Sequence, residues 1–250
     1  MFENSHWDDL AGRGFTVISD AIGQPLLQAA QAAARHLNEV HPDGGWERTR
    51  NETWREVRYC RHPDLMAIAS NVLDPLALDI LESAPPVDFV QFASTMPGFA
   101  TKGGIGRNFH IDGGTEKVLG VFNIIFGCAL TDVASDTVGG FHVLPGSHKK
   151  FAKAFEELPA DAPIPFGDIK IETQRRLLAE ARMVVPRLAA GDIVVAHSFL
   201  AHGTSANTSE VRRDMIFQRR AAAPMWDPAT QVSARERFMR DPWTMFRRRP

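Results

Sequence analysis

Two short stretches of the sequence contain the residue types that bind a catalytic metal. His110 and Asp112 stand two residues apart in Asn-Phe-His-Ile-Asp-Gly-Gly. In a strand, residues at this spacing point to the same side, so an imidazole and a carboxylate lie together. His202, in Ala-His-Gly-Thr-Ser-Ala-Asn after a β-like run, is the candidate third ligand. Two histidines and one carboxylate leave open metal positions, an arrangement that suits non-haem Fe(II) and oxygen chemistry.

An arginine close to these ligands in the sequence is a candidate anion site. Arg213 lies 11 residues after His202, at the start of the β-like run Met215–Gln218. A guanidinium that faces the interior of a barrel is costly unless a carboxylate or phosphate meets it. A dicarboxylate that chelates the metal at one end would present its other carboxylate to Arg213. The Thr204 hydroxyl, two residues after His202, is placed to donate to the same group.

Other histidines have structural interpretations. His197 is the rival third ligand, but its strand parity matches that of the apolar Ile193 and Val195, so we expect it to be packed inside the protein. His142 and His148 flank the Pro-Gly turn at 145–146, where we expect a hydrogen bond that fixes the turn. A lone His-x-Asp pair is usually a surface feature, and it is the combination with His202 and Arg213 that favours a metal site.

The elements that must position these residues change character near residue 87. Before it, Pro25–Val40 carries an apolar helical stripe, and Pro63–Val72 opens a second helix that we expect Pro75 to interrupt before Leu76–Leu81. After it, short β-like runs alternate with Gly, Pro, Asn and Asp clusters. These runs are Val87–Thr95, Phe109–Asp112, Val118–Leu130, Gly140–Leu144, Met183–Val185, Asp192–Ala196 and Met215–Gln218.

The pattern predicts one domain over residues 1–250. We expect a barrel or jelly roll, with an all-β core over about residues 87–220, and N-terminal helices packed outside it. The insert Phe151–Arg182 interrupts the series of strands and holds a polar helix at about Glu172–Arg182.

Composition excludes several classes of protein. Lys plus Arg is 28 and Asp plus Glu is 30 in 250 residues, so no basic surface for nucleic acid is expected. Two cysteines cannot make a disulfide scaffold, which fits a reducing compartment. The longest apolar-rich run, Val118–Leu130, is too short to span a bilayer, and residues 1–10 do not resemble a secretory leader. We expect a cytoplasmic monomer or homodimer that binds a small molecule and no membrane.

Three stretches resemble the phytanoyl-CoA dioxygenase family of Fe(II)- and 2-oxoglutarate-dependent oxygenases. They are His110–Asp112, Gly139–Lys149 (GGFHVLPGSHK) and Gly191–Arg213 (GDIVVAHSFLAHGTSANTSEVRR). The resemblance implies a double-stranded β-helix, the jelly roll of the cupins, buttressed by the N-terminal helices. It also implies that His110, Asp112 and His202 bind iron, and that Arg213 and Thr204 hold the distal carboxylate of 2-oxoglutarate. Gln91 is the further candidate for a 2-oxoglutarate contact, with Ser94, Thr95 and Lys102 as alternatives.

The activity that this resemblance implies is hydroxylation of an unactivated C–H bond in a small metabolite. O2 and 2-oxoglutarate are consumed, and succinate and CO2 are released. Desaturation or cyclisation with the same cofactors stays open, as do a cupin-type metal enzyme without 2-oxoglutarate and a non-catalytic binding module. Halogenation is disfavoured because Asp112 fills the position that a halide would need. Arg58 and Arg107 are candidate anion contacts for the substrate, although both could equally be solvated.

Overall fold

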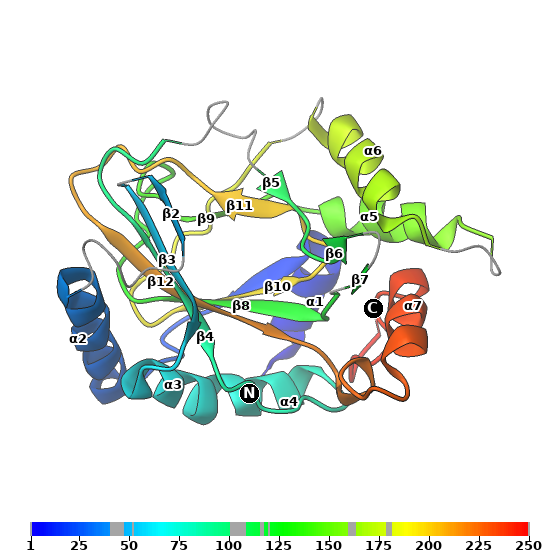
Figure 1. Cartoon of the computed structure of the whole chain (residues 1–250), viewed down its shortest axis with the longest axis horizontal. Helices are drawn as coiled ribbons and strands as arrows, with labels where there is room; N and C mark the ends of the chain where they lie inside the picture. The colour runs from blue at the N-terminus through cyan, green and yellow to red at the C-terminus, as the bar shows by residue number, and fades with distance from the viewer. Residues whose placement is uncertain are drawn as a thin grey trace.

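Two antiparallel sheets lie on opposite sides of a cavity in the middle of the protein (Figure 1). A computed structural model describes residues 2–40, 48–51, 53–100, 109–115, 118–119, 121–159, 164–178 and 182–249. The larger sheet has seven strands in the order β1-β10-β8-β12-β4-β3-β2, and the smaller has three in the order β5-β11-β9. A separate two-stranded ribbon joins β6 and β7.

The strands are short and the helices flank them. The strands are β1 Phe15–Ile18, β2 Arg48–Asn51, β3 Trp54–Cys60, β4 Val90–Thr95, β5 Phe109–His110, β6 Gly114–Thr115, β7 Val118–Leu119, β8 Ile124–Ala129, β9 Phe141–Val143, β10 Ile193–His197, β11 His202–Thr204 and β12 Arg213–Arg220. The α-helices are α1 Asn4–Arg13, α2 Gln24–Val40, α3 Pro63–Ile68, α4 Asp74–Ile80, α5 Ser147–Glu156, α6 Phe166–Leu178 and α7 Gln231–Arg240. A π-helical segment, Ala69–Leu73, joins α3 to α4, and a 3₁₀ turn, Ala223–Met225, follows β12.

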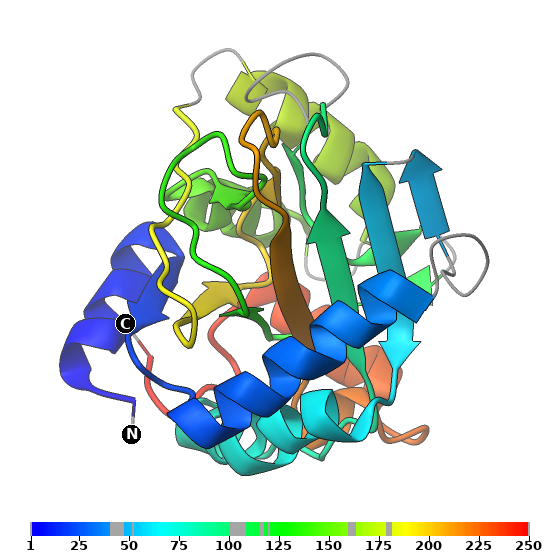
Figure 2. The same ribbon diagram turned by 90° about the vertical axis from the view of Figure 1, so that its left-hand side faces the viewer.

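Side chains of β12 alternate between the cavity and the helical layer. Phe217 and Arg219 line the cavity beside the smaller sheet. Gln218, between them, reaches the cavity edge and donates to the carbonyl oxygens of Val87 and Phe89. Asp214, on the other face, lies beside Asn38 of α2, which crosses that face of the sheet (Figure 2). The predicted helix at 25–40 is therefore confirmed as the cover of the larger sheet.

The predicted boundaries of the β core are too narrow. Outside residues 87–220, β1 pairs with β10, and β3 pairs with β4 and carries β2 at the sheet edge. The sequence pattern does not predict these strands, because β1 has only four residues and β3 carries several charged side chains. Cross-strand pairing with distant segments, and not local apolar alternation, holds them in the sheet.

Three expectations for individual elements are also wrong. Pro75 does not interrupt its helix, because it lies in the first turn of α4, where a missing N–H is tolerated. Residues 183–185 form no named strand but a single bridge, Val143 to Val184. The insert holds two described helices, α5 and α6, and α6 begins six residues before the predicted helix at 172. No described helix is both long and apolar enough to cross a membrane.

Candidate metal centre

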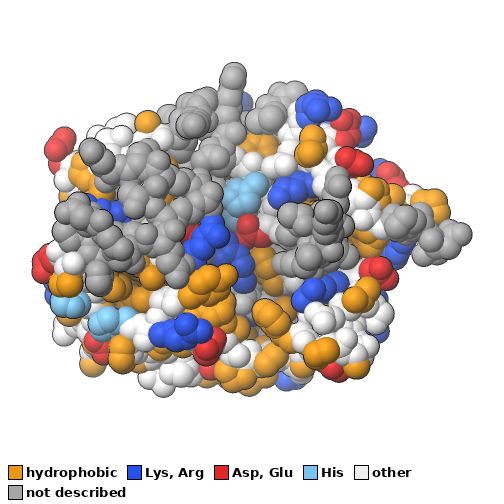
Figure 3. All heavy atoms as spheres, viewed as in Figure 1, with side chains coloured by type: hydrophobic (Ala, Val, Ile, Leu, Met, Phe, Trp, Pro, Cys, Tyr) orange, Lys and Arg blue, Asp and Glu red, His pale blue; other side chains and the backbone are white. Residues whose placement is uncertain are grey.

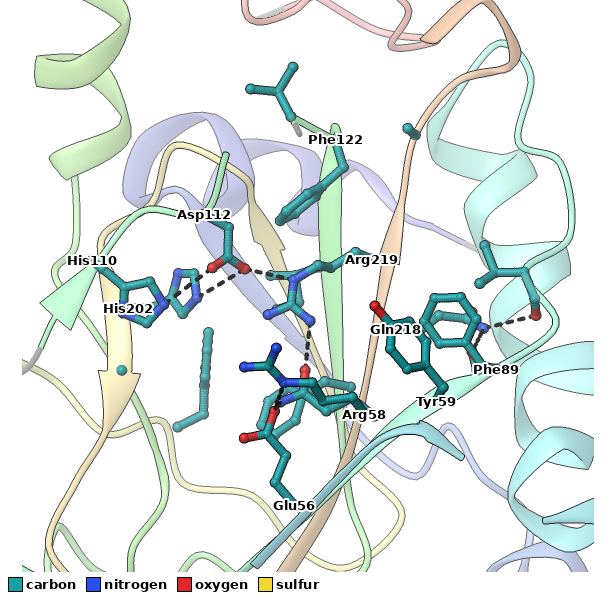
Figure 4. Close-up of a pocket in the computed structure, with 18 of the residues that line it drawn as sticks. Glu56, Arg58, Tyr59, Phe89, His110, Asp112, Phe122, His202, Gln218 and Arg219 are labelled. Carbon is teal, nitrogen blue, oxygen red and sulfur yellow. Dashed lines mark hydrogen bonds and ion pairs between the residues drawn. The ribbon is translucent and has the colours of Figure 1, made fainter. Parts of the chain in front are cut away.

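The smaller sheet brings the predicted ligands together. β5 and β11 are antiparallel neighbours, and their register sets His110 directly opposite His202. Asp112 follows His110 by two residues, and its Oδ1 lies 3.2 Å from His110 Nε2 (Figure 4). The second carboxylate oxygen, Oδ2, lies 3.7 Å from His202 Nε2. One nitrogen or oxygen from each residue falls within 4.8 Å of the others, so one ion can contact all three side chains.

His202 is held in the form that binds a metal. Its Nδ1 lies 2.9 Å from the carbonyl oxygen of Leu200, which can only accept, so Nδ1 carries the proton and Nε2 keeps its lone pair. Burial lowers the pKa of His202 to about 4, so the ring is neutral near pH 7. A neutral imidazole with a fixed tautomer is what metal coordination requires.

Asp112 is ionised and oriented by its neighbours. Burial acts to raise the pKa of its carboxyl group, but the Arg219 guanidinium and the hydrogen bond with His110 outweigh it. Together they hold the pKa of Asp112 well below its ordinary value of 3.8. Asp112 is therefore a carboxylate throughout the neutral pH range, as a metal ligand must be.

Arg219 is the residue of this centre that sequence reasoning missed. Its Nε donates to Asp112 Oδ2 at 2.7 Å, and its Nη1 donates to Gln91 Oε1 at 2.7 Å. Gln91 in turn donates to Glu56 Oε1 at 3.0 Å. Gln91 lines the cavity, but both ends of its amide already pair with protein groups, and its contact with 2-oxoglutarate stays a prediction.

We expect Arg219→Met to lower iron affinity by about 10- to 100-fold. Partners that orient a metal-bound carboxylate typically contribute this much to metal affinity, and the methionine keeps the apolar stem while losing both hydrogen bonds. Anaerobic equilibrium dialysis against Fe(II) measures the change. The matched control is Arg61→Met, which removes an exposed guanidinium paired with Asp88. Unchanged iron affinity in Arg219→Met would show that this ion pair does not support the metal centre.

Arg213 lies in the interior beside β4 and β9. Only 1% of the residue is exposed; Nε donates to Gly139 O at 2.5 Å, and Nη1 donates to Ala93 O at 3.3 Å. Its Nη2 is buried without a hydrogen-bond partner in the described part of the chain. Burial lowers the pKa of Arg213 to about 10, so the charge remains at neutral pH. A buried cation with an unpaired donor is a site for an anion.

Thr204 adjoins the same segment as Arg213. It lines the cavity at the end of β11, where it pairs with Phe141, two residues after the carbonyl of Gly139 that Arg213 contacts. Gly139 has a φ of +73°, and a Cβ there would lie 2.1 Å from Thr95 Oγ1. Glycine thus allows this close approach of β4 to the segment. Arg213 itself is not among the residues that line the cavity and lies deeper in the protein.

The cavity beside the three candidate ligands has a volume of about 590 Å³. His110, Asp112 and His202 line it on one side, and aromatic side chains form much of the rest: Trp54, Tyr59, Phe89, Phe99, Phe122, Phe141, Phe217 and Trp226. On the molecular surface, basic side chains gather around a hollow beside a histidine and an acidic group (Figure 3). This volume and lining suit a small organic molecule.

The rival ligand His197 is a packed residue, as its strand parity predicts. Its Nε2 lies 3.0 Å from Pro242 O, and its Nδ1 accepts the Phe199 N–H at 3.0 Å. The ring stacks on Phe238 and Phe246. The prediction for His148 is wrong, because its Nε2 contacts the Ala11 carbonyl of α1 at 3.2 Å instead of fixing the 145–146 turn.

These buried histidines predict that the fold loses stability in acid. Burial lowers the pKa of His197 to about 3 and that of His148 to about 4, against an ordinary value of 6.5. Between pH 6.5 and 4 the unfolded chain therefore binds protons that the folded chain does not. The free energy of unfolding should fall as the pH drops through this window, by about 1.4 kcal/mol per pH unit for each such histidine.

Urea unfolding of His197→Gln at several pH values between 4.5 and 7 tests this expectation. The variant should show a shallower dependence of the unfolding free energy on pH than the wild type. Replacement of the exposed His36 by glutamine is the control and should leave the slope unchanged. Parallel curves for His197→Gln and the wild type would contradict the assignment of a proton-free buried imidazole.

Comparison with known proteins agrees with this architecture. A family model described as phytanoyl-CoA dioxygenase (PhyH) matches residues 12–215. The comparison with curated proteins found no match. Among solved structures, the non-heme alpha ketoglutarate dependent carbocyclase SnoK from nogalamycin biosynthesis aligns with a TM-score of 0.63 and 18% identity over 88% of this chain and 84% of its own. HygX from Streptomyces hygroscopicus, solved with nickel and 2-oxoglutarate bound, aligns with a TM-score of 0.59 and 16% identity over 89% and 88%.

The epimerase SnoN, also from nogalamycin biosynthesis, aligns with a TM-score of 0.63 and 17% identity over 88% of this chain and 82% of its own. At these identities the likeness establishes the fold. It confirms the predicted jelly roll, with its all-β core and flanking helices.

Proposed function

The chain belongs to the phytanoyl-CoA dioxygenase family, and we propose that it is an Fe(II)- and 2-oxoglutarate-dependent dioxygenase that hydroxylates a C–H bond of a small molecule. The observation that supports the proposal most directly is that three candidate ligand atoms lie within 4.8 Å of one another at the wall of a cavity rich in aromatic side chains. The buried Nη2 of Arg213, which has no hydrogen-bond partner among the described residues, supports 2-oxoglutarate as the cosubstrate.

The donor set fits iron(II). Two imidazole nitrogens and one carboxylate oxygen are the ligands of the non-haem iron oxygenases, and they leave positions open for a cosubstrate and O2. The protein holds each part of the set: Leu200 fixes the tautomer of His202, and Arg219 orients Asp112. Bound iron and 2-oxoglutarate would supply the oxidising power, with succinate and CO2 as products of the cosubstrate.

Arg213 and Thr204 fit the distal carboxylate of 2-oxoglutarate. The unpaired Nη2 of Arg213 and the hydroxyl of Thr204 are donors beside the same 139–141 segment. A carboxylate here would satisfy a charge that has no acidic partner among the described residues within ion-pair distance. An isomerase or lyase of the cupin type gives this buried guanidinium no role.

Two phenylalanine rings shield one side of the candidate metal centre from water. Phe141 packs against His202 with ring centroids 5.2 Å apart, and Phe217 packs behind it at 5.7 Å. These rings exclude water from the side of the centre that they cover and leave the cavity as the space for a substrate C–H bond. With iron bound, Asp112 would take the coordination position that a halide needs, so transfer of oxygen is favoured over transfer of chloride.

A metabolite screen tests the hydroxylation outcome. Compounds that stimulate succinate release from 2-oxoglutarate would be identified first, and their products would then be analysed by mass spectrometry under 18O2. We expect a product heavier by one oxygen atom that carries the label. A product that has lost two hydrogens, or one of unchanged mass, would replace hydroxylation by desaturation, cyclisation or epimerisation while leaving the cofactors in place.

A further inference from the structure

We propose that the substrate carries a carboxylate, which Arg58 binds through its two terminal nitrogens, while the apolar body of the substrate lies on the aromatic wall. The inference rests on the proposed function, because it names the substrate class of the same site. It follows from the geometry of Arg58, from its link to the metal ligands and from the charge of the cavity.

Arg58 has the free end of its guanidinium in the cavity. It projects from β3 and lines the cavity wall, and only its Nε is engaged, donating to Glu56 Oε1 at 3.1 Å. Among the described residues, none forms a hydrogen bond or ion pair with its Nη1 or Nη2. These two nitrogens form the two-pronged end that matches a carboxylate. Figure 4 shows Arg58 beside Arg219, with both guanidinium groups directed toward the space in front of the histidines.

A continuous chain of hydrogen bonds fixes Arg58 relative to the metal centre. Glu56 accepts from Arg58 and, at 3.0 Å, from Gln91, while the Trp54 indole donates to its other oxygen at 3.3 Å. Gln91 is joined through Arg219 to Asp112. Glu56 is only 4% exposed, so the chain is anchored inside the protein. A substrate held at Arg58 therefore has a defined position relative to the metal ligands.

The charge of the cavity favours an anion. Its described lining includes three guanidinium groups and two carboxylates: Arg58, Arg219, Arg235, Glu56 and Asp112. A metal dication and a 2-oxoglutarate dianion would cancel one another, so a surplus of positive charge remains. Arg235 adds an Nε that is buried without a hydrogen-bond partner in the described residues. Like charges that line one cavity repel unless an anion joins them.

The rest of the cavity suits an apolar body. Phe89, Phe122 and Trp226 line it together with Val87, Val121 and Met225. A volume of about 590 Å³ accommodates a molecule with one or more rings in addition to the cosubstrate. The substrate class is therefore a carboxylic acid with an aromatic or bulky apolar part.

Binding of 3-phenylpropionate and of its neutral isostere 3-phenylpropionamide tests this inference. The protein would first be loaded with Fe(II) and 2-oxoglutarate without oxygen, so that the Arg213 site is filled and only the outer cavity is free. Isothermal titration should show that the acid binds about 10- to 100-fold more tightly than the amide, as a charge-assisted pair of hydrogen bonds provides. In Arg58→Gln this preference should be lost.

The design separates the possible failures. Arg61→Gln, which removes an exposed arginine just beyond β3, should keep the preference for the acid. Because Arg58→Gln leaves the Glu56 carboxylate without its cation, Glu56→Gln/Arg58→Gln provides a charge-balanced second variant that should behave in the same way. Equal binding of acid and amide by the wild type, or binding of neither, overturns the inference, as does a preference that persists in both Arg58 variants. Failure of the wild type to bind 2-oxoglutarate at the loading step would overturn the proposed function instead.

Discussion

Replacement of His202 by alanine is expected to abolish iron binding and 2-oxoglutarate turnover together. The substitution removes one of the three proposed ligands, the imidazole that β11 sets opposite His110. Loss of a group that merely orients a ligand costs about 10- to 100-fold in metal affinity, so loss of a ligand should cost at least about 100-fold. Metal analysis after anaerobic reconstitution, followed by assay of succinate release, measures both effects.

His197→Ala is the matched control for this experiment. It removes a histidine five residues earlier that packs on Phe238 and Phe246 and lies outside the ligand cluster. The variant should keep a full complement of iron, with a loss of stability because a buried ring is truncated. If His197→Ala lost iron while His202→Ala retained it, the assignment of the third ligand would be reversed.

Arg213→Ala is expected to weaken 2-oxoglutarate binding by about 30- to 5000-fold while leaving Fe(II) bound. Truncation of one member of a buried ion pair typically costs about 2–5 kcal/mol, which corresponds to this range. Arg213→Lys should fall between the wild type and the alanine variant, because an ammonium keeps the charge but not the forked geometry. Titration of 2-oxoglutarate into each iron-loaded variant gives the affinities.

Arg212→Ala serves as the control for Arg213. Neighbouring strand residues face opposite sides, and Arg212 pairs with Asp214 at 2.9 Å on the face away from the cavity. Its replacement should leave 2-oxoglutarate affinity unchanged. An equal or larger effect at Arg212 would remove Arg213 from the cosubstrate site and favour a cupin-type metal enzyme.

The parts of the site that depend on local spacing could be predicted from the sequence. His110 and Asp112 share a side because they are two residues apart at the end of a strand, and Arg213 and Arg212 diverge because they are adjacent. The pairing of β5 with β11, which sets His110 opposite His202, depends on contacts between distant segments. No local pattern in the sequence predicts that pairing, although both histidines were candidate ligands.

Arg219 was not predicted as a site residue, because the apolar pattern of its strand stops before it. The run of residues 215–218 predicts a strand that stops before two arginines, yet β12 continues to Arg220. Each arginine is tolerated because a carboxylate from elsewhere in the chain neutralises it: Asp112 pairs with Arg219, and Asp74 pairs with Arg220. The alternation of side chains along a strand could have identified Arg219. It lies six residues after Arg213, so the two side chains face the same side of the sheet.

β3 was missed for a related reason. Its charged residues do not follow the apolar alternation typical of a strand, although it pairs with β4. Glu56 is stabilised by hydrogen bonds from Gln91 and Arg58. Such partners come from segments far apart in the sequence, so local patterns do not identify them. Arg107, the other candidate anion contact, and Lys102, an alternative to Gln91, lie outside the described residues.

The most direct test of the central claim is anaerobic titration of 2-oxoglutarate into the Fe(II)-loaded wild-type protein, monitored by visible absorption. Chelation of Fe(II) by a 2-oxo acid produces a metal-to-ligand charge-transfer band. We predict that this band will grow to saturation at one 2-oxoglutarate per iron and that it will be absent from the iron-free protein. An iron-loaded wild-type protein that develops no band at any 2-oxoglutarate concentration would contradict the assignment of this chain as a 2-oxoglutarate-dependent dioxygenase.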